Sequence, residues 1–238
     1  MHSSSLLAVA TLLSTAAAVA APVRARAPAP DTPTPTSVPP VFPTTTPTPP
    51  GRFYLKTQVK SGQTGKDAFD GLYLYAYHTG AGTNDAMLSS NVSVAGKAYQ
   101  QPGTVPDTTG GTQQPAYFSV LFDLGSPDVP WQLVPQPSVN IYAGWQPVRI
   151  NAGAAGPSNS SAFYLDDDNE LEWTNTAGTS TPSSFDGWLV CQWWHTDIDN
   201  PGEPGTQLFF RVNGFGDSTP SSCADVNLVQ EHIAVPLA

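Results

Sequence analysis

The stretch from Phe185 to Thr196 constrains the fold more than any other part of the sequence. It reads Phe-Asp-Gly-Trp-Leu-Val-Cys-Gln-Trp-Trp-His-Thr and holds three of the six tryptophans and one of the two cysteines. An Asp-Gly turn signal followed by aromatic and β-branched residues predicts a strand, whose side chains point alternately to two faces. Apolar residues occupy both faces, with Leu189, Cys191, Trp193 and His195 on one and Trp188, Val190, Gln192 and Trp194 on the other. We therefore expect a strand in the centre of a sandwich or closed barrel, buried on both sides.

Short apolar segments separated by Gly, Pro, Asn and Ser clusters predict about a dozen strands and no long helix. The expected strands are Phe53–Val59, Leu72–His78, Ala86–Ser89, Tyr117–Leu124, Trp131–Val134, Val139–Tyr142, Val148–Asn151, Ala162–Asp166, Glu170–Thr174, Trp188–His195, Gln207–Val212 and Val226–Glu231. This pattern is typical of an all-β sandwich or closed barrel. A trefoil-like barrel is one form to test, because Phe69-Asp-Gly and Phe185-Asp-Gly introduce two strands alike, although one turn chemistry used twice explains the pair equally well.

One hairpin can be predicted down to its register. The apolar residues between Phe163 and Trp173 share a face only if Phe163 pairs with Trp173 and Leu165 pairs with Leu171. The loop Asp167–Asn169 then has three residues. Its last position requires a left-handed backbone, which asparagine tolerates best after glycine.

The same register sets Asp166 opposite Glu170, with Glu172 further along that face. Like charges across a strand pair are unfavourable unless something offsets them, and calcium prefers carboxylate oxygens. Asp166 and Glu170 are therefore candidate calcium ligands, although a solvated acidic turn is the simpler interpretation. The carboxylates also suggest a glycan-active hydrolase, but catalysis needs carboxyl groups in unequal environments, and a hairpin tip is expected to leave all of them in water.

The charge balance disfavours several classes of partner. The chain carries 9 Lys and Arg against 19 Asp and Glu, a net charge of -10 at pH 7, so it has no basic stripe to neutralise phosphates. We expect neither nucleic-acid binding nor attachment to a membrane surface. The sequence contains no His-Glu-x-x-His, zinc-spaced cysteine pair or Gly-x-Ser-x-Gly motif, so we expect no cofactor.

Aromatic residues are the remaining functional signal. Tyr73, Tyr75 and Tyr77 alternate along one face of a predicted strand, and Trp145 lies in a Gly-Trp-Gln-Pro segment that predicts an exposed loop. Flat rings of this kind stack on sugars, whereas aromatic residues also dominate the cores of ordinary β proteins. These four residues are the candidate carbohydrate-binding residues, with Trp145 the first choice.

The first 51 residues differ in composition from the rest. Residues 1–20 combine an apolar run with Ala18-Val19-Ala20, which matches a signal-peptidase site, and predict a secreted protein. Residues 21–51 are rich in Pro and Thr and predict a disordered segment, either a pro-segment or a stalk that holds the domain away from a wall. Residues 52–238 are the predicted all-β domain.

Secretion has two consequences for this domain. In an oxidising compartment the two cysteines can form one bridge, Cys191–Cys223. The sequons Asn91-Val-Ser and Asn159-Ser-Ser lie in polar, loop-like sequence, so we expect N-glycans on Asn91 and Asn159.

Several segments of the domain together resemble a family of uncharacterised secreted proteins of filamentous fungi. These segments are Arg52–Thr57, Phe69–Leu74, Phe163–Leu171, Phe185–Cys191, Gln207–Phe210 and Ser222–Leu228. The resemblance covers nearly all of the chain after Gly51. It implies a secreted single domain, and because the family carries no assigned activity, it implies no catalytic residues.

The sequence therefore favours a secreted, non-catalytic all-β protein of a fungal exterior or cell wall that binds wall or host polysaccharide. A glycan-active hydrolase and a structural or protein-interaction module are the alternatives. Buried carboxylates in a cleft would favour the hydrolase, whereas a solvent-facing acidic turn would not.

Overall fold

Twelve β-strands and two short 3-10 helices form the part of the protein that the computed structural model describes. This part comprises residues 51–103, 117–125, 129–136, 143–153, 162–177, 182–215 and 218–234, all within one unit, Pro47–Ala238. The strands are β1 (Phe53–Val59), β2 (Tyr73–Gly80), β3 (Thr83–Ser89), β4 (Lys97–Pro102), β5 (Phe118–Asp123), β6 (Trp131–Pro135), β7 (Trp145–Ala152), β8 (Ala162–Leu165), β9 (Leu171–Thr174), β10 (Phe185–Thr196), β11 (Pro204–Val212) and β12 (Cys223–His232). The 3-10 helices are η1 (Asp67–Phe69) and η2 (Val92–Val94), and the described residues contain no α-helix.

These strands overlap the expected segments except at two places, although some begin earlier than expected, as β7 does at Trp145. β4 has no counterpart among the expected strands, because its sequence Lys-Ala-Tyr-Gln-Gln-Pro is mostly polar and only Ala98 is fully buried. Its pairing with β5 over six residues defines it as a strand. The expected strand Val139–Tyr142 lies outside the described residues.

Six strands close a barrel through antiparallel pairing in the order β1–β4–β5–β8–β9–β12. β1 and β12 pair from Phe53 opposite His232 to Val59 opposite Val226. A bridge between Glu170, the residue before β9, and Val229 on β12 completes the ring. Closure of this kind removes free strand edges.

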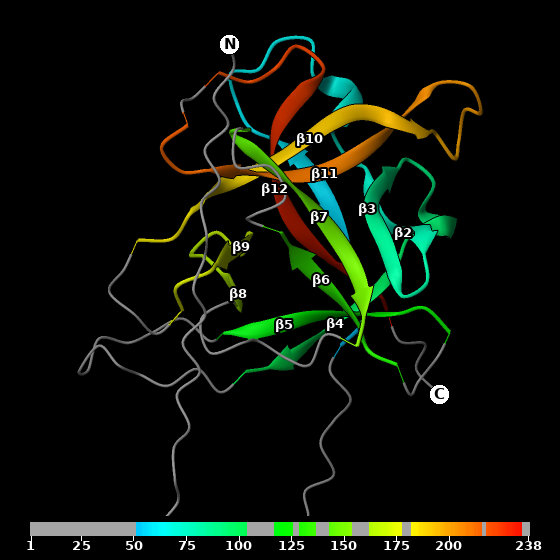
Figure 1. Ribbon diagram of the computed structural model, residues 1–238, viewed down its shortest axis with the longest axis vertical. Helices are drawn as coiled ribbons and strands as arrows, with labels where there is room; N and C mark the ends of the chain where they lie inside the picture. The colour runs from blue at the N-terminus through cyan, green and yellow to red at the C-terminus, as the bar shows by residue number, and fades with distance from the viewer. Residues whose placement is uncertain are drawn as a thin grey trace, which may run out of the picture. The chain divides into compact units, whose positions relative to one another are not determined.

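The hairpins β2–β3, β6–β7 and β10–β11 form a second group and pair with one another. β3 pairs with β11, β11 with β7 and β3 with β7, and Figure 1 shows β7, β10 and β11 side by side, with β4 and β5 further down the same unit. The chain thus divides into three successive groups of four strands, β1 to β4, β5 to β8 and β9 to β12. In each group the first and last strands belong to the barrel and the middle two form a hairpin, which is the strand order of a trefoil. Strand pairing that runs through two of the hairpins also closes a larger barrel of nine strands, in the order β1–β2–β3–β7–β6–β5–β8–β9–β12. The predicted all-β closed barrel is therefore confirmed.

Aromatic side chains fill the interior. Trp173 and Trp188 are almost completely buried, and the Trp188 ring stacks on Phe163 with the centroids 6.4 Å apart. The indole Nε1 of Trp188 donates a hydrogen bond to the carbonyl oxygen of Leu171, 2.5 Å away, which satisfies the one polar atom of this core residue.

The predicted disulfide is present and joins Cys191 on β10 to the directly opposite Cys223 on β12. It lies with Leu189 and Phe209 in a second, smaller cluster of buried residues, separate from the main core. The expectation that β10 is buried on both faces is therefore confirmed from Trp188 to Cys191.

The expectation fails for the last part of β10. Gln192, Trp193 and Trp194 are all exposed, whereas His195 is 4% exposed. The pairing with β11 shifts register between Gln192 and Thr196, and such a bulge breaks the strict alternation of side chains. Trp193 and Trp194 consequently do not point to opposite faces as the sequence predicted.

The hairpin β8–β9 has the predicted register. Phe163 pairs with Trp173 and Leu165 with Leu171. Asn169 has the left-handed backbone that its position requires, with φ at 61°.

Candidate functional site

Trp145 is the first residue of β7 and is not in the loop that the sequence predicted. Its ring is half-buried and packs against the cluster that surrounds the disulfide. Arg211 on the adjacent strand β11 pairs with Trp145 through the backbone. This pairing explains why the Gly-Trp-Gln-Pro segment is held in extended form. The ring is therefore only partly accessible to solvent.

The three tyrosines share the outer face of β2, but each of them is buried or in contact with another side chain of the protein. Tyr75 is 4% exposed, and burial raises the pKa of its hydroxyl to about 12. The Tyr73 hydroxyl donates to the Glu231 carboxylate, 3.1 Å away. The Tyr77 ring packs on His195 with the centroids 4.6 Å apart. The tyrosine face is thus a packed surface more than an open platform.

A groove of about 290 Å³ brings Trp145 together with Trp193 and Trp194 of β10, the strand that the sequence predicted to be buried on both faces. Trp194 is 76% exposed and Trp193 is 38% exposed, the two largest side chains that face solvent among the described residues. The other groove residues come from β3, β7, β11 and the segment before β7, and they are Asp85, Ala143, Pro147, Arg149, Gln207 and Phe209. The groove therefore lies on the outer face of the three paired hairpins.

An ion-paired network supports the groove. Asp85 Oδ2 lies 2.6 Å from Nε2 of the buried His195, and Asp85 Oδ1 lies 3.3 Å from Nε of Arg149. The His195 ring in turn packs on Trp194, with the centroids 4.0 Å apart. Because Asp85 and Arg149 are directly paired on β3 and β7, the hairpin pairing itself sets this geometry.

Two polar atoms at the groove lack hydrogen bonds within the described part of the chain. Gln207 is 2% exposed and its Oε1 has no partner, and Arg149 Nε makes no hydrogen bond despite its ion pair. A buried polar atom without a partner costs about 1 to 3 kcal/mol, so native proteins usually provide it with water or a ligand. The groove thus combines flat rings with unused hydrogen-bonding capacity.

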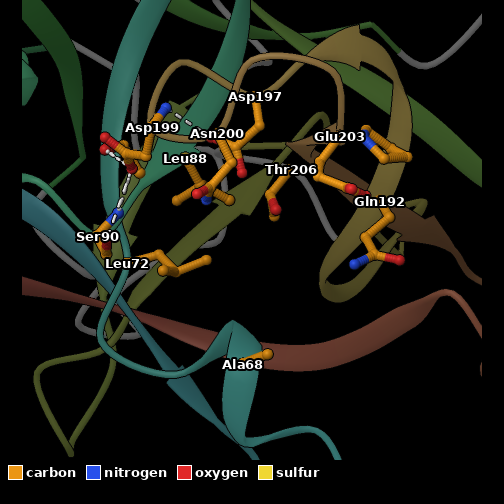
Figure 2. Close-up of a pocket in the computed structure, with 12 residues that line it drawn as sticks. Ala68, Leu72, Leu88, Ser90, Gln192, Asp197, Asp199, Asn200, Glu203 and Thr206 are labelled. Atoms are coloured by element: carbon orange, nitrogen blue, oxygen red, sulfur yellow. Dashed lines mark hydrogen bonds between the residues drawn. The ribbon is translucent and has the colours of Figure 1, made fainter.

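A second cavity of about 300 Å³ lies under the loop between β10 and β11, and it is polar and acidic (Figure 2). Asp199 Oδ2 accepts hydrogen bonds from Ser89 Oγ at 2.6 Å and from Ser90 N at 3.2 Å, so this carboxylate ties the loop to the end of β3. Asp197 Oδ1 accepts from Asp199 N at 2.8 Å. The carboxylates of Asp197 and Asp199 thus hold the loop, and no tryptophan is among the described residues that line this cavity.

The candidate calcium ligands also have protein partners. Asp166 Oδ1 accepts from Asp168 N and Glu170 N, at 3.0 and 2.9 Å, and Glu170 Oε1 accepts from Asn227 Nδ2 at 2.5 Å. Burial, with the charges of Asp166 and Asp168, raises the pKa of the Glu170 carboxyl. The described residues contain no group of three His, Cys, Asp or Glu arranged to hold a metal ion. Calcium binding stays a prediction.

Glu172 corrects the expectation that every carboxylate of this hairpin lies in water. Its side chain is partly buried in a cavity of about 290 Å³ that is also lined by Lys60, Tyr164 and Asp186. Burial raises the pKa of the Glu172 carboxyl to about 7, and the charge of Lys60 opposes part of this rise. The pattern of alternating residues on β9 contained no sign of this, because Lys60 and Asp186 lie outside the β8–β9 hairpin.

Among the predicted glycosylation sites, Asn91 is exposed at the start of η2, where its Oδ1 accepts from Ser93 N at 3.0 Å. Asn159 lies outside the described residues, as do the predicted signal peptide 1–20 and residues 21–50 of the predicted linker. None of the described residues belongs to a helix long and apolar enough to span a membrane.

The fold and the groove define a β-trefoil domain with an aromatic surface groove. Residues 50–232 match the family described as a domain of unknown function, DUF7907, and the chain belongs to this family. The comparisons with curated proteins and with solved structures found no match.

Proposed function

We propose that this protein is a secreted, non-catalytic protein of a fungal exterior that binds cell-wall or host polysaccharide in the groove formed by Trp145, Trp193 and Trp194. The observation that carries the proposal is the exposure of two adjacent tryptophans, at 38% and 76%, beside a third ring in one groove. Exposed apolar surface of this kind marks an interaction site, and an indole ring matches the apolar face of a sugar ring.

Three further features support this choice. The groove is lined by both rings and polar groups, as ligand sites are, whereas the acidic cavity under the β10–β11 loop has no ring. A nucleic acid is disfavoured as the occupant, because its phosphates need many cationic contacts and Arg149 is the one cationic residue among the described residues that line the groove. The disulfide and the predicted leader are compatible with an extracellular protein.

Retention on insoluble polysaccharides tests the proposal. The full secreted protein is incubated with chitin, β-glucan, cellulose and pectin, and the bound fraction is compared with that of Trp194→Ala and Trp193→Ala. Loss of one stacking ring costs about 1 to 1.5 kcal/mol, so we expect affinity to fall about 10-fold in each variant. The melting temperature of Trp194→Ala should stay unchanged because its ring is mostly in solvent.

Val92→Ala serves as the control, since Val92 is also exposed but lies on η2 and not in the groove. Trp145→Ala is less informative, because its ring supports the cluster around the disulfide and its removal should also lower stability. Equal retention of the wild type and both tryptophan variants, or no retention of the wild type on any polysaccharide, would refute the proposal.

One observation favours a second candidate, a glycan-active hydrolase. Glu172 is a partly buried acid with a pKa of about 7, suited to a general acid, and Asp186 lines the same cavity. Release of reducing ends from the same polysaccharides at pH 6, abolished by Glu172→Gln, would support this alternative. Retention without release would support binding alone.

A further inference from the structure

We propose that the groove selects sugars that carry a carboxylate, that is, uronic acids; this proposal rests on the proposed function. Arg149 is the residue that determines this specificity. Arg149 and Asp85 are the two charged residues that line the groove, and the guanidinium is the one cationic group among them.

The guanidinium is oriented from one side. Asp85 Oδ1 lies 3.3 Å from Nε, and the other oxygen of Asp85 is engaged by His195 at 2.6 Å. Asp85 therefore faces Nε, and in the described residues the two terminal nitrogens of Arg149 take part in no hydrogen bond or ion pair. About a third of the Arg149 side chain is exposed, and it lines the groove beside the tryptophans.

An arginine held in this way presents a planar pair of donors. A carboxylate accepts two parallel charge-assisted hydrogen bonds from such a pair, whereas a hydroxyl of a neutral sugar accepts one weaker bond. Asp85 offsets the positive charge of the guanidinium when the groove is empty, so Arg149 can stay partly buried without a ligand.

Gln207 supplies a second, independent indication of a ligand. Its side chain is 2% exposed, lines the same groove and leaves Oε1 without a hydrogen-bond partner in the described part of the chain. A carbonyl oxygen accepts hydrogen bonds, and a sugar hydroxyl donates them. A uronic acid has both features that the groove needs: an anionic acceptor for Arg149 and hydroxyl donors for Gln207, on a ring that stacks on Trp194.

The test uses trisaccharides of galacturonic acid and of glucuronic acid, each with its methyl ester, and isothermal titration calorimetry on the full secreted protein. The ester keeps the sugar rings and the hydroxyls of the ligand, removes its charge and adds one methyl group to each carboxyl. We expect the free acid of at least one of the two sugars to bind at least 10-fold more tightly than its ester, and Arg149→Gln to bring the two affinities within about 2-fold. The two sugars distinguish which uronic acid is the source of the carboxylate.

Arg52→Gln is the matched control for loss of one positive charge, because Arg52 is an exposed arginine that pairs with Asp123 and does not line the groove. It should keep the preference for the free acid. Arg149→Lys should keep only part of the preference, since an ammonium cannot form the paired contact, and melting temperatures verify that each variant is folded.

The outcomes separate this inference from the proposed function. If acid and ester bind equally, or if Arg149→Gln keeps the preference, the carboxylate inference is wrong while polysaccharide binding stands. If neither these trisaccharides nor any neutral polysaccharide binds, both are wrong.

Discussion

Replacing Glu172 by glutamine should make the protein more stable at alkaline pH and leave it nearly unchanged at pH 5. Burial raises the pKa of this carboxyl from 4.5 to about 7. Between these two values the folded state binds more protons than the unfolded state, so stability falls as the pH rises. Above pH 7 both states are ionised, and the folded state carries the full cost of a partly buried carboxylate.

The size of this cost follows from the pKa. A shift from 4.5 to about 7 corresponds to an upper limit of about 3.4 kcal/mol at 1.36 kcal/mol for each pH unit. Water and Lys60 screen a carboxylate that is only partly buried, so we expect about 1 to 2 kcal/mol. For a domain of this size, that raises the melting temperature of Glu172→Gln by roughly 2 to 8 °C at pH 8.5.

Calorimetric melting of the wild type and Glu172→Gln at pH 5 and pH 8.5 measures the effect. Glu231→Gln is the control with the opposite sign, because a hydrogen bond from Lys56 lowers the pKa of Glu231. That carboxylate stabilises the fold above the unfolded pKa, so Glu231→Gln should lower the melting temperature at pH 8.5 and approach the wild type as the pH falls. An equal gain for Glu172→Gln at both pH values, or a loss at pH 8.5, would show that Glu172 is not a costly buried charge.

Two further variants test the framework. Replacing both Cys191 and Cys223 by alanine opens a bridge across 32 residues and should cost about 4 kcal/mol by the loop-entropy estimate, seen as a drop of roughly 8 to 15 °C on thermal melting; a loss below about 1 kcal/mol would contradict it. Asn169→Ala should lower the free energy of unfolding, measured in urea, by about 1 kcal/mol, because alanine tolerates the left-handed backbone poorly. Asn169→Gly should not lower it, and equal losses in the two variants would show that backbone conformation is not the cause.

The barrel was predictable because local signals and long-range pairing agree. The repeated Phe-Asp-Gly motif is an example: it precedes β2 in the first four-strand group and begins β10 in the third, two equivalent positions in the trefoil order. Gly71 and Gly187 both have positive φ, at 70° and 98°, which glycine adopts without strain, although Gly71 lies in a turn before β2 and Gly187 lies at a register shift within β10. The second group starts its hairpin at Trp131 without this motif, which is why the sequence shows two copies of a threefold arrangement.

The hairpin β8–β9 was predictable for a similar reason. Its register depends only on which residues are apolar and on the length of one turn, both of which are local properties. The partial burial of Glu172 depends instead on residues outside the hairpin, such as Lys60 and Asp186. A pattern of alternating residues identifies the face that a side chain shares, but not what covers that face.

The groove could not be predicted, because it depends on one irregularity in β10. Strict alternation places Trp193 and Trp194 on opposite faces and predicts that both are buried. The register shift between Gln192 and Thr196 leaves both rings exposed at one groove and turns His195 inward to Asp85. Bulges add a residue to one strand without changing the composition that defines it as a strand, so hydrophobic patterns do not reveal them. The same deviation that made the sequence prediction wrong is therefore what creates the candidate site: without it, Trp194 could not join Trp145 and Arg149 in one groove.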